Sequence, residues 1–445
     1  MKMWVRGLYR ALWWLLFPLL LVRLGWRGRK EPAYRQHWRE RFGFYTQSVP
    51  SMRPVCWLHC VSVGETRAAK PLIEALLQNY PQYSLLITHT TPTGRATSHA
   101  LFDAQVTQVY LPYEYQSGIR RFLRHFRPSV GLVLETECWP LLFSEAQRIN
   151  LPVFLINARL SARSAKGYAR WPSVIQPTLA SLRQVLAQTV ADAQRLTSLG
   201  ARHVSVMGNL KYDFTPPETL LQLGSAWRTA WGKRPVVLFA SSREGEEALL
   251  LAAWQAQPRQ ALLVLVPRHP QRFDEVANLL HTQGFRYQRR SVGAALKPET
   301  TVILGDSMGE LFAYYAAADV ALLGGSFLPF GGQNLIEACA VGTPIIFGAH
   351  TFNFTQAASL AESAGAGIAV ADMPTAVAQA EALLQEPSRR LAMREAGLAF
   401  TRGQQGASER VLATLAPYLS MPLPMPEPLL DKVLVGKQGQ HPCDD

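Results

Sequence analysis

The residues that could do chemistry lie in loops that follow short apolar runs. Glu65 ends the loop SVGE after the run at 55–60, as a lone carboxylate ahead of a helix-like stretch. Ser241 and Ser242 follow the run VVLFA, and Arg268 follows ALLVLV. A carboxylate can serve as a general base. An arginine and the N–H groups of a helix N-terminus near Gly245 can hold an anionic group.

A second glycine-rich loop, GGQN at 331–334, precedes a helical stretch that carries Glu337. Any one of these motifs alone is more typical of an ordinary turn or a surface charge. Four of them at the ends of predicted strands favour one site for an anionic ligand.

Alternating elements must position these loops. The apolar runs are VCWLHC, SLLITH, VGLVLE and PVFLIN in the first half, then VVLFA, ALLVLV, TVILG, VALLGG and PIIFG after a Pro-rich break at 215–218. Strands that alternate with helices predict parallel sheets covered on both faces. Ligands bind beyond the carboxyl ends of such strands. We therefore predict an α/β fold with two Rossmann-like domains, and the segments 1–26, 27–215, 216–420 and a Pro-rich tail at 421–445.

The sequence lacks the motifs of several kinds of binding and catalytic site. No G-x-G-x-x-G stands between a strand and a helix, and no G-x-x-x-x-G-K-[ST] occurs, so dinucleotide and P-loop sites are disfavoured. There is no H-E-x-x-H, and the Asp of GDSMGE lacks a second ligand nearby. We expect neither a metal nor another cofactor.

Composition indicates an anionic partner in a reducing compartment. The 445 residues include 45 Lys and Arg against 32 Asp and Glu, a net charge of +13. Nucleic acid, a membrane surface or a phosphorylated ligand would each suit that charge. The five scattered cysteines argue against disulfides. We interpret Cys56 and Cys60 as buried apolar side chains rather than metal ligands.

The N-terminal sequence indicates that the anionic partner is a membrane surface. The stretch at 8–22, LYRALWWLLFPLLLV, is short for a full span and contains Pro18. We predict a membrane anchor or monotopic helix in 1–26; the alternative is a hydrophobic helix packed on its own domain. Interfacial tryptophans and basic residues facing anionic headgroups would be Trp4, Trp13, Trp14, Trp26, Arg27, Arg29, Lys30, Arg35, Arg39 and Arg41.

Several longer motifs in the sequence are typical of one protein family. In order, they are WLHCVSVGE, ITHTTPTG, ETECWP, NARLSARSAKGY, GNLKYD, VPRHPQRF, GDSMGEL, GGQNLIE and GAHTFNF. To about residue 418 the chain resembles the Kdo (3-deoxy-D-manno-oct-2-ulosonic acid) transferases of lipopolysaccharide biosynthesis. The resemblance implies a GT-B fold on the cytoplasmic face of the inner membrane. It also implies CMP-Kdo as donor, a tetra-acylated lipid A precursor as acceptor, and no required metal.

The same resemblance implies roles for individual residues. Glu65 matches the catalytic base of an inverting single displacement. The donor-binding residues would be Ser242, Arg268, His269, Ser307, Met308, Gly309, Glu310, Gly332, Asn334 and Glu337, with a helix N-terminus at Gly332 facing the phosphate. The acceptor-binding residues would be Thr90, Thr93, Gly94, Glu137, Asn157 and Arg159. Glu135 either joins this site or pairs structurally with Arg159.

Three positions depart from the family pattern. Ser242 and Arg243 replace a Thr-His pair, Gln333 replaces a His, and Ala349 replaces a Pro. Gln333 can still donate a hydrogen bond, and Arg243 adds charge. The alternatives are a nucleic-acid-binding protein, and a GT-B-like epimerase or transferase that takes another sugar nucleotide or acceptor. The basic residues gather at the N-terminus and in loops rather than along one helix, so we expect no nucleic acid.

Overall fold

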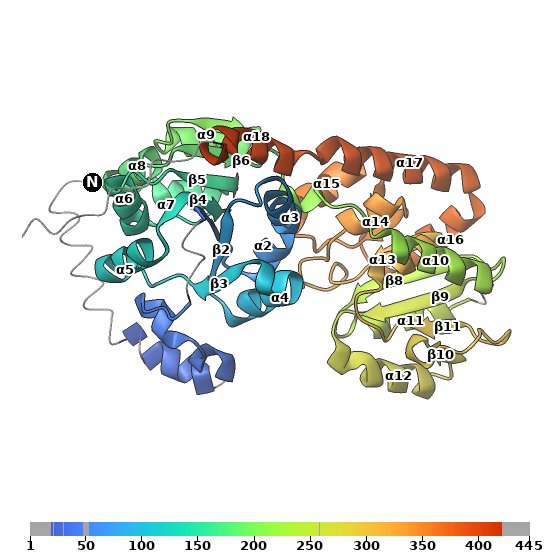
Figure 1. The fold of residues 1–445 in the computed structure, drawn as a ribbon. Coiled ribbons are helices and arrows are strands. Elements are labelled where there is room, and N and C mark those ends of the chain that lie inside the picture. The colour runs from blue at the N-terminus through green and yellow to red at the C-terminus, as the bar shows by residue number, and fades with distance from the viewer. Residues whose placement is uncertain (1–18, 21, 30, 48–52, 258, 421–445) are drawn as a thin grey trace, which may run out of the picture.

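Two parallel sheets of seven strands each form the molecule (Figure 1). The computed structural model describes residues 19–420 except 21, 30, 48–52 and 258. The strand orders are β3-β2-β1-β4-β5-β6-β7 and β10-β11-β9-β8-β12-β13-β14. Helices connect the successive parallel strands, so the prediction of two Rossmann-like α/β domains is confirmed.

The strands of the first sheet are nearly continuous buried runs, as expected where helices cover both faces. They are β1 (Val55–His59), β2 (Ser84–His89), β3 (Thr107–Tyr110), β4 (Pro128–Leu134), β5 (Val153–Ala158), β6 (Gln184–Ala187) and β7 (Val204–Val206). Its helices are α2 (Val63–Ala68), α3 (Lys70–Asn79), α4 (Pro92–Phe102), α5 (Gln116–Phe126), α6 (Pro140–Arg148), α7 (Ala162–Tyr168), α8 (Pro172–Ala180) and α9 (Val190–Ser198).

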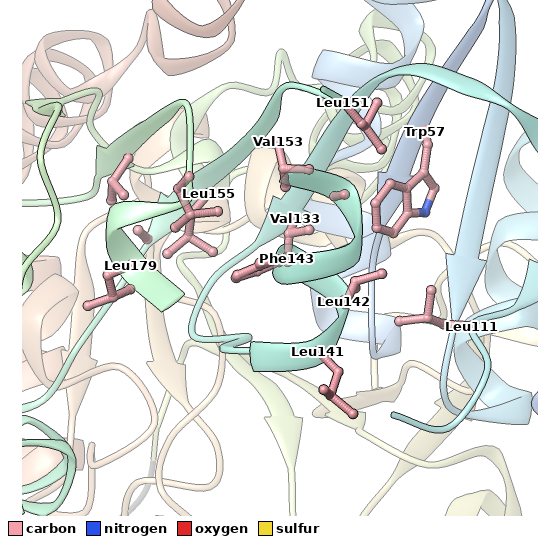
Figure 2. Packing of buried hydrophobic residues seen from close by; sticks show 14 of the residues in the cluster. Trp57, Leu111, Val133, Leu141, Leu142, Phe143, Leu151, Val153, Leu155 and Leu179 are labelled. Carbon is pink, nitrogen blue, oxygen red and sulfur yellow. The ribbon is translucent and has the colours of Figure 1, made fainter. Parts of the chain in front are cut away.

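Large side chains fill the space between this sheet and its helices. Trp57 of β1 is fully buried, and its indole N–H donates to Thr88 Oγ1 at 2.8 Å. Gly131 of β4 leaves room for the ring, since a Cβ there would lie 2.8 Å from the indole. Figure 2 shows Val133 and Phe143 in the same cluster. On the opposite face Cys56 and Cys60 are buried, which confirms their interpretation as apolar core residues.

The second sheet repeats the pattern. Its strands are β8 (Val236–Ser242), β9 (Leu262–Pro267), β10 (Tyr287–Arg289), β11 (Val302–Leu304), β12 (Val320–Leu323), β13 (Ile345–Phe347) and β14 (Gly367–Ala369). The helices are α10 (Glu218–Ala230), α11 (Glu246–Gln255), α12 (Phe273–Thr282), α13 (Leu311–Ala317), α14 (Ile336–Val341), α15 (Thr355–Ser363), α16 (Met373–Gln385), α17 (Pro387–Gln404) and α18 (Ala407–Leu419).

The chain crosses between the domains twice. After β7 it enters the second domain, and α18 returns to pack on the first, with Val411 and Leu415 in the core beside α3. The Asp213 carboxylate accepts N–H groups from Gly406, at 2.8 Å, and from the first residues of α18. The predicted segment 216–420 placed α18 in the second domain, so its packing on the first is a correction.

The predicted anchor lies mostly outside the described residues. Among those described, no helix is long and apolar enough to cross a membrane. Two short 3-10 helices, η1 (Pro32–Arg35) and η2 (Trp38–Phe42), follow it. Arg41 is 3% exposed, which corrects its predicted place among groups facing lipid. It donates to the Thr90 carbonyl at 2.9 Å, and its guanidinium lies 3.9 Å from the centre of the Tyr110 ring.

Candidate active site

Each sheet has a point where the strand order reverses, between β1 and β4 in the first and between β8 and β12 in the second. Connections leave in opposite directions there, which opens a crevice at the carboxyl ends of the strands. Glu65 follows β1 and Glu135 follows β4. Ser242 ends β8, and the loop that begins at Gly324 follows β12.

Glu65 occupies the first turn of α2. Ser62 is the N-cap, and Glu65 lies three residues on, the spacing of a capping box. Its carboxylate accepts the Val61 N–H at 2.8 Å and the Ser62 hydroxyl at 2.9 Å. These contacts fix the side chain over the end of β1. Glu65 thus belongs to the N-terminal capping arrangement of α2, and this structural role is compatible with a catalytic one.

Burial raises the pKa of Glu65 to about 7. The negative charges of Glu135 and Glu137 act in the same direction, while the hydrogen bonds from Val61 and Ser62 oppose them. The side chain is 8% exposed. A carboxyl group with a pKa near neutrality can accept a proton from a substrate hydroxyl far better than an ordinary glutamate.

The loop THTTPTG supports Glu65 from the neighbouring strand. The hydroxyls of Thr90 and Thr91 donate to the Val61 carbonyl at 3.3 and 3.0 Å. A Cβ on Gly94 would lie 2.9 Å from Thr91 Oγ1 and 3.2 Å from the Val61 carbonyl oxygen, so glycine allows α4 to approach this loop. Thr93 is exposed on the first turn of α4.

The other predicted acceptor residues, Glu137, Arg159 and Asn157, differ in their exposure and in their partners. Glu137 accepts from Trp139 Nε1 at 2.6 Å, and burial raises its pKa. Arg159 is exposed, and the structure joins it to Glu135 by no ion pair, although both residues are described. Asn157 is fully buried, with Oδ1 accepting from the Leu210 N–H at 3.1 Å. It therefore supports the interdomain linker, and its predicted contact with an acceptor stays a prediction.

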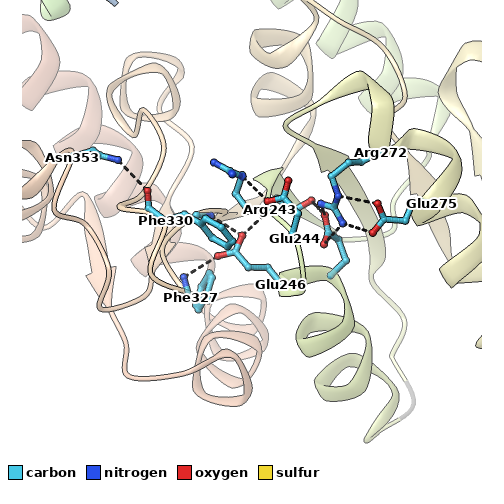
Figure 3. A network of polar contacts seen from close by, with 11 residues as sticks. Arg243, Glu244, Glu246, Arg272, Glu275, Phe327, Phe330 and Asn353 are labelled. Atoms are coloured by element: carbon cyan, nitrogen blue, oxygen red, sulfur yellow. Dashed lines mark hydrogen bonds and ion pairs between the residues drawn. The ribbon is translucent and has the colours of Figure 1, made fainter. Parts of the chain in front are cut away.

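Buried carboxylates shape the facing edge of the second sheet. Glu246 accepts N–H groups from Arg243 at 2.9 Å, Gly325 at 2.7 Å and Phe327 at 3.0 Å, as Figure 3 shows in part. It thereby ties the loop after β12 to the end of β8. The N–H groups that the sequence offered to a phosphate near Gly245 are thus partly bound by this internal carboxylate.

Below that edge lies a buried ion pair. Arg272 donates two hydrogen bonds to Glu247, at 2.7 and 3.1 Å, and two more to Glu275, at 3.2 and 3.0 Å. Glu247 also accepts from Ser242 Oγ at 2.6 Å. Ser242 is therefore engaged in orienting the end of β8.

Positive charge gathers above the same strand ends. Burial lowers the pKa of His269, and the guanidinium groups of Arg243 and Arg268 lower it further. The imidazole is therefore neutral at pH 7 beside two permanent cations. The Arg243 guanidinium lies 4.4 Å from the centre of the Phe330 ring. Such a cluster suits an anionic group of a donor.

Glu337, on α14 of the second domain, lies within electrostatic range of α2 of the first domain. Burial raises the pKa of this carboxyl, while Asn334, whose Nδ2 donates to it at 3.0 Å, and the charges of Arg268 and Arg67 lower it. Arg67 belongs to α2, two residues beyond Glu65. The candidate base and the candidate donor residues therefore lie on facing edges. No sequence signal pointed to Arg67, because this approach joins segments far apart in the chain.

One prediction about the glycine-rich loop is wrong. The helix there begins at Ile336, not at Gly332. Gly331 and Gly332 both have a positive φ, which a right-handed helix does not allow. The N–H of Gly332 donates to the Gly325 carbonyl at 2.6 Å instead of pointing at a ligand.

The remaining predicted donor residues lie in the loop after β11. Ser307 Oγ and Tyr314 share a hydrogen bond of 2.8 Å, and Glu310 pairs with Arg290 at 3.0 Å. Met308 is 57% exposed, and Gly309 has a positive φ. Met308 and Gly309 are exposed, whereas Ser307 and Glu310 are half-buried and have internal partners.

Comparison with known proteins decides the family. The model of the 3-deoxy-D-manno-octulosonic-acid transferase (kdotransferase) family matches residues 36–214. A Kdo transferase from Bordetella pertussis is 44% identical over 431 residues, which cover 93% of this chain and 99% of that protein. The chain belongs to the Kdo transferase family. A Kdo transferase from Haemophilus influenzae is 37% identical and covers 94% of this chain and 99% of its own.

The protein is therefore a Kdo transferase, a glycosyltransferase of lipopolysaccharide biosynthesis. A solved structure, the UDP-GlcNAc 2-epimerase from Neisseria meningitidis, superposes with a TM-score of 0.55 at 18% identity. The superposition covers 82% of this Kdo transferase and all of the epimerase. That likeness confirms the two-domain fold.

Proposed function

We propose that this Kdo transferase moves Kdo from CMP-Kdo to a hydroxyl of a tetra-acylated lipid A precursor, at the cytoplasmic face of the inner membrane. The observation that carries the mechanism is the position of Glu65, which is 8% exposed just beyond the carboxyl end of β1 and is held there by Val61 and Ser62, where burial raises its pKa to about 7. The N-terminal segment would hold the enzyme at the bilayer.

The reaction would be a single displacement with inversion. The acceptor oxygen forms a bond to the anomeric carbon of Kdo, the bond to the phosphate oxygen breaks, and CMP leaves with the electron pair. Glu65 takes the proton of the attacking hydroxyl. Arg243 and Arg268 would hold the negative charge of the donor, and Glu337 would accept hydrogen bonds from ribose hydroxyls.

The test is a mass-spectrometric transfer assay on detergent-solubilised protein with CMP-Kdo and the tetra-acylated precursor. One or more Kdo mass increments on the acceptor would support the proposal. CMP should inhibit, whereas UDP at the same concentration should not. Inhibition by UDP alone, with no increment, would favour the alternative of another sugar nucleotide.

The pH dependence of kcat/KM should show the titration of the proposed catalytic base. We expect kcat/KM to rise about tenfold per pH unit below pH 7 and to level off above it, because only deprotonated Glu65 can accept the proton. Replacing Glu137 by Gln removes a charge that raises the pKa of Glu65, so the midpoint should move to lower pH. A profile with an unmoved midpoint would contradict this coupling.

Removal of metals should leave the rate unchanged. We propose that no metal takes part, since the described residues contain no group of three His, Cys, Asp or Glu placed to hold one. Turnover measured in excess EDTA should equal the untreated rate. A loss of activity that Mg²⁺ or Mn²⁺ restores would contradict the proposal.

A further inference from the structure

Helix α7 presents a basic face that the reaction does not use. None of its seven residues is buried. Ala165 and Tyr168 pack against the core of the first domain. Arg163, Lys166 and Arg170 are spaced at i, i+3 and i+7, so they share the opposite side of the helix and its C-terminal continuation. We call these three residues the α7 basic face.

Nothing in the structure neutralises this face. No Asp or Glu occurs between residues 146 and 191. All three cations are exposed, and none has an ion pair or side-chain hydrogen bond in the described part of the chain. The acidic group on the adjacent α9, Asp192, is bound to the Leu160 N–H at 2.9 Å and to Arg195 at 3.0 Å. The α7 basic face is thus available for an external anion.

Exposed apolar side chains flank the three cations. Trp171, directly after Arg170, is 67% exposed. Val190, the first residue of α9, is 62% exposed, and α9 packs beside α7. Tryptophan next to lysine and arginine is the combination that partitions to the headgroup region of a bilayer. Nucleic-acid binding would use the cations but give Val190 no partner.

The position of α7 connects this face with the site. Helix α7 directly follows the carboxyl end of β5, and Tyr168 on its inner side packs against the core. Burial raises the pKa of the Tyr168 phenol, and the charges of Cys138 and Glu137 raise it further. Glu137 in turn acts on Glu65. A surface that binds α7 would therefore lie beside the carboxyl edge of the first sheet, where a lipid acceptor must enter.

We propose that the α7 basic face and Trp171 dock the enzyme on an anionic lipid surface, as a second contact besides the N-terminal segment. The inference rests on the proposed function in one respect: a lipid acceptor gives the enzyme a reason to orient this edge toward a bilayer. With two contacts far apart in the chain, the first domain would keep a fixed orientation on the membrane.

The test compares three full-length proteins: wild type, an Arg163→Gln/Lys166→Gln/Arg170→Gln variant, and a matched control. The control neutralises three exposed cations of the second domain, Lys233, Arg286 and Lys297. Partitioning is measured by flotation with vesicles of phosphatidylethanolamine and phosphatidylglycerol. We expect the α7 variant to partition about 100-fold more weakly, since three cations that each contribute on the order of 1 kcal/mol near an anionic surface are removed. The control should stay within about twofold of wild type.

The N-terminal segment is common to all three proteins, so the difference between the variants isolates the α7 basic face. Trp171→Ser should weaken binding to the same vesicles without changing its dependence on salt. CMP binding, measured on every variant, checks folding and does not depend on a lipid. The partitioning result also stands apart from turnover, so it can fail while the transfer reaction is confirmed, or the reverse.

Three outcomes would overturn the proposal. Equal losses in the α7 variant and the control would mean that net charge alone drives the binding. If the α7 variant partitions like wild type but has a raised KM for acceptor dispersed in detergent, the α7 basic face binds the phosphates of the acceptor itself. Binding of wild type to a DNA duplex as tightly as to vesicles, lost in the α7 variant, would assign it to nucleic acid.

Discussion

Replacing Glu65 by Gln is expected to lower the turnover number by about 100-fold or more and to leave CMP binding nearly unchanged. The amide has the shape of the carboxylate, so its oxygen can still accept the Val61 N–H and its nitrogen can donate to Ser62 Oγ. Only the capacity to take a proton is lost. Mass-spectrometric counting of Kdo increments over time, with CMP binding by calorimetry, gives both quantities.

Glu74→Gln is the matched control, because Glu74 is an exposed carboxylate on α3 that pairs with Lys70. Its rate should lie within about twofold of wild type. If Glu65→Gln keeps most of its rate, Glu65 is not the base. Glu135 and Glu137 are then the carboxylates to replace next, since their charges act on Glu65 from the end of β4.

Replacing Arg272 by Ala is expected to destabilise the second domain by about 3–5 kcal/mol, the usual cost of leaving a buried charge unpaired. Arg272 is 6% exposed and its partner Glu247 is 1% exposed. Donor affinity should fall as well, because Glu247 also holds the Ser242 hydroxyl at the end of β8. Thermal unfolding followed by fluorescence, with and without CMP, measures both effects.

Two further variants separate charge burial from donor binding. Lys70→Ala removes a partner from an exposed ion pair and should change stability by less than about 1 kcal/mol. The double replacement Arg272→Met/Glu247→Leu should recover most of the lost stability, because no buried charge is left unpaired. It should not recover CMP affinity, since Ser242 then lacks its acceptor. A double variant as unstable as Arg272→Ala would contradict the buried-charge explanation.

The sequence predicted the parts of the fold that depend on local pattern. All nine quoted apolar runs form strands, because a strand covered on both faces must be apolar along most of its length. Strands outside those runs, such as β3, β7 and β10, are short and carry polar or partly exposed residues, so their local signal is weak. Their pairing with a neighbouring strand decides their structure.

The candidate site was predicted less completely, for a related reason. Motif positions placed Glu65 and Arg268 after strand ends and Glu337 on a helix that follows a glycine-rich loop, because connectivity fixes which edge a loop joins. The sequence did not show that Glu246 binds the loop after β12, nor that Arg67 approaches Glu337. Both relations join segments distant in the chain, and the first takes up N–H groups that a local pattern offers to a ligand. Gly332 was misplaced because a glycine-rich stretch is compatible with a turn as well as a helix start.

The return of α18 sets the order in which the protein can be completed during synthesis. Val411 and Leu415 belong to the core of the first domain, yet they are translated after every strand of the second. The nascent first domain leaves the ribosome with the apolar surface beside α3 uncovered, while domains elsewhere commonly fold one after another from the N-terminus. The N–H groups at the start of this helix, from residues 406–408, are accepted by Asp213, which is made long before. The core of the first domain can therefore be completed only after the whole second domain has been translated.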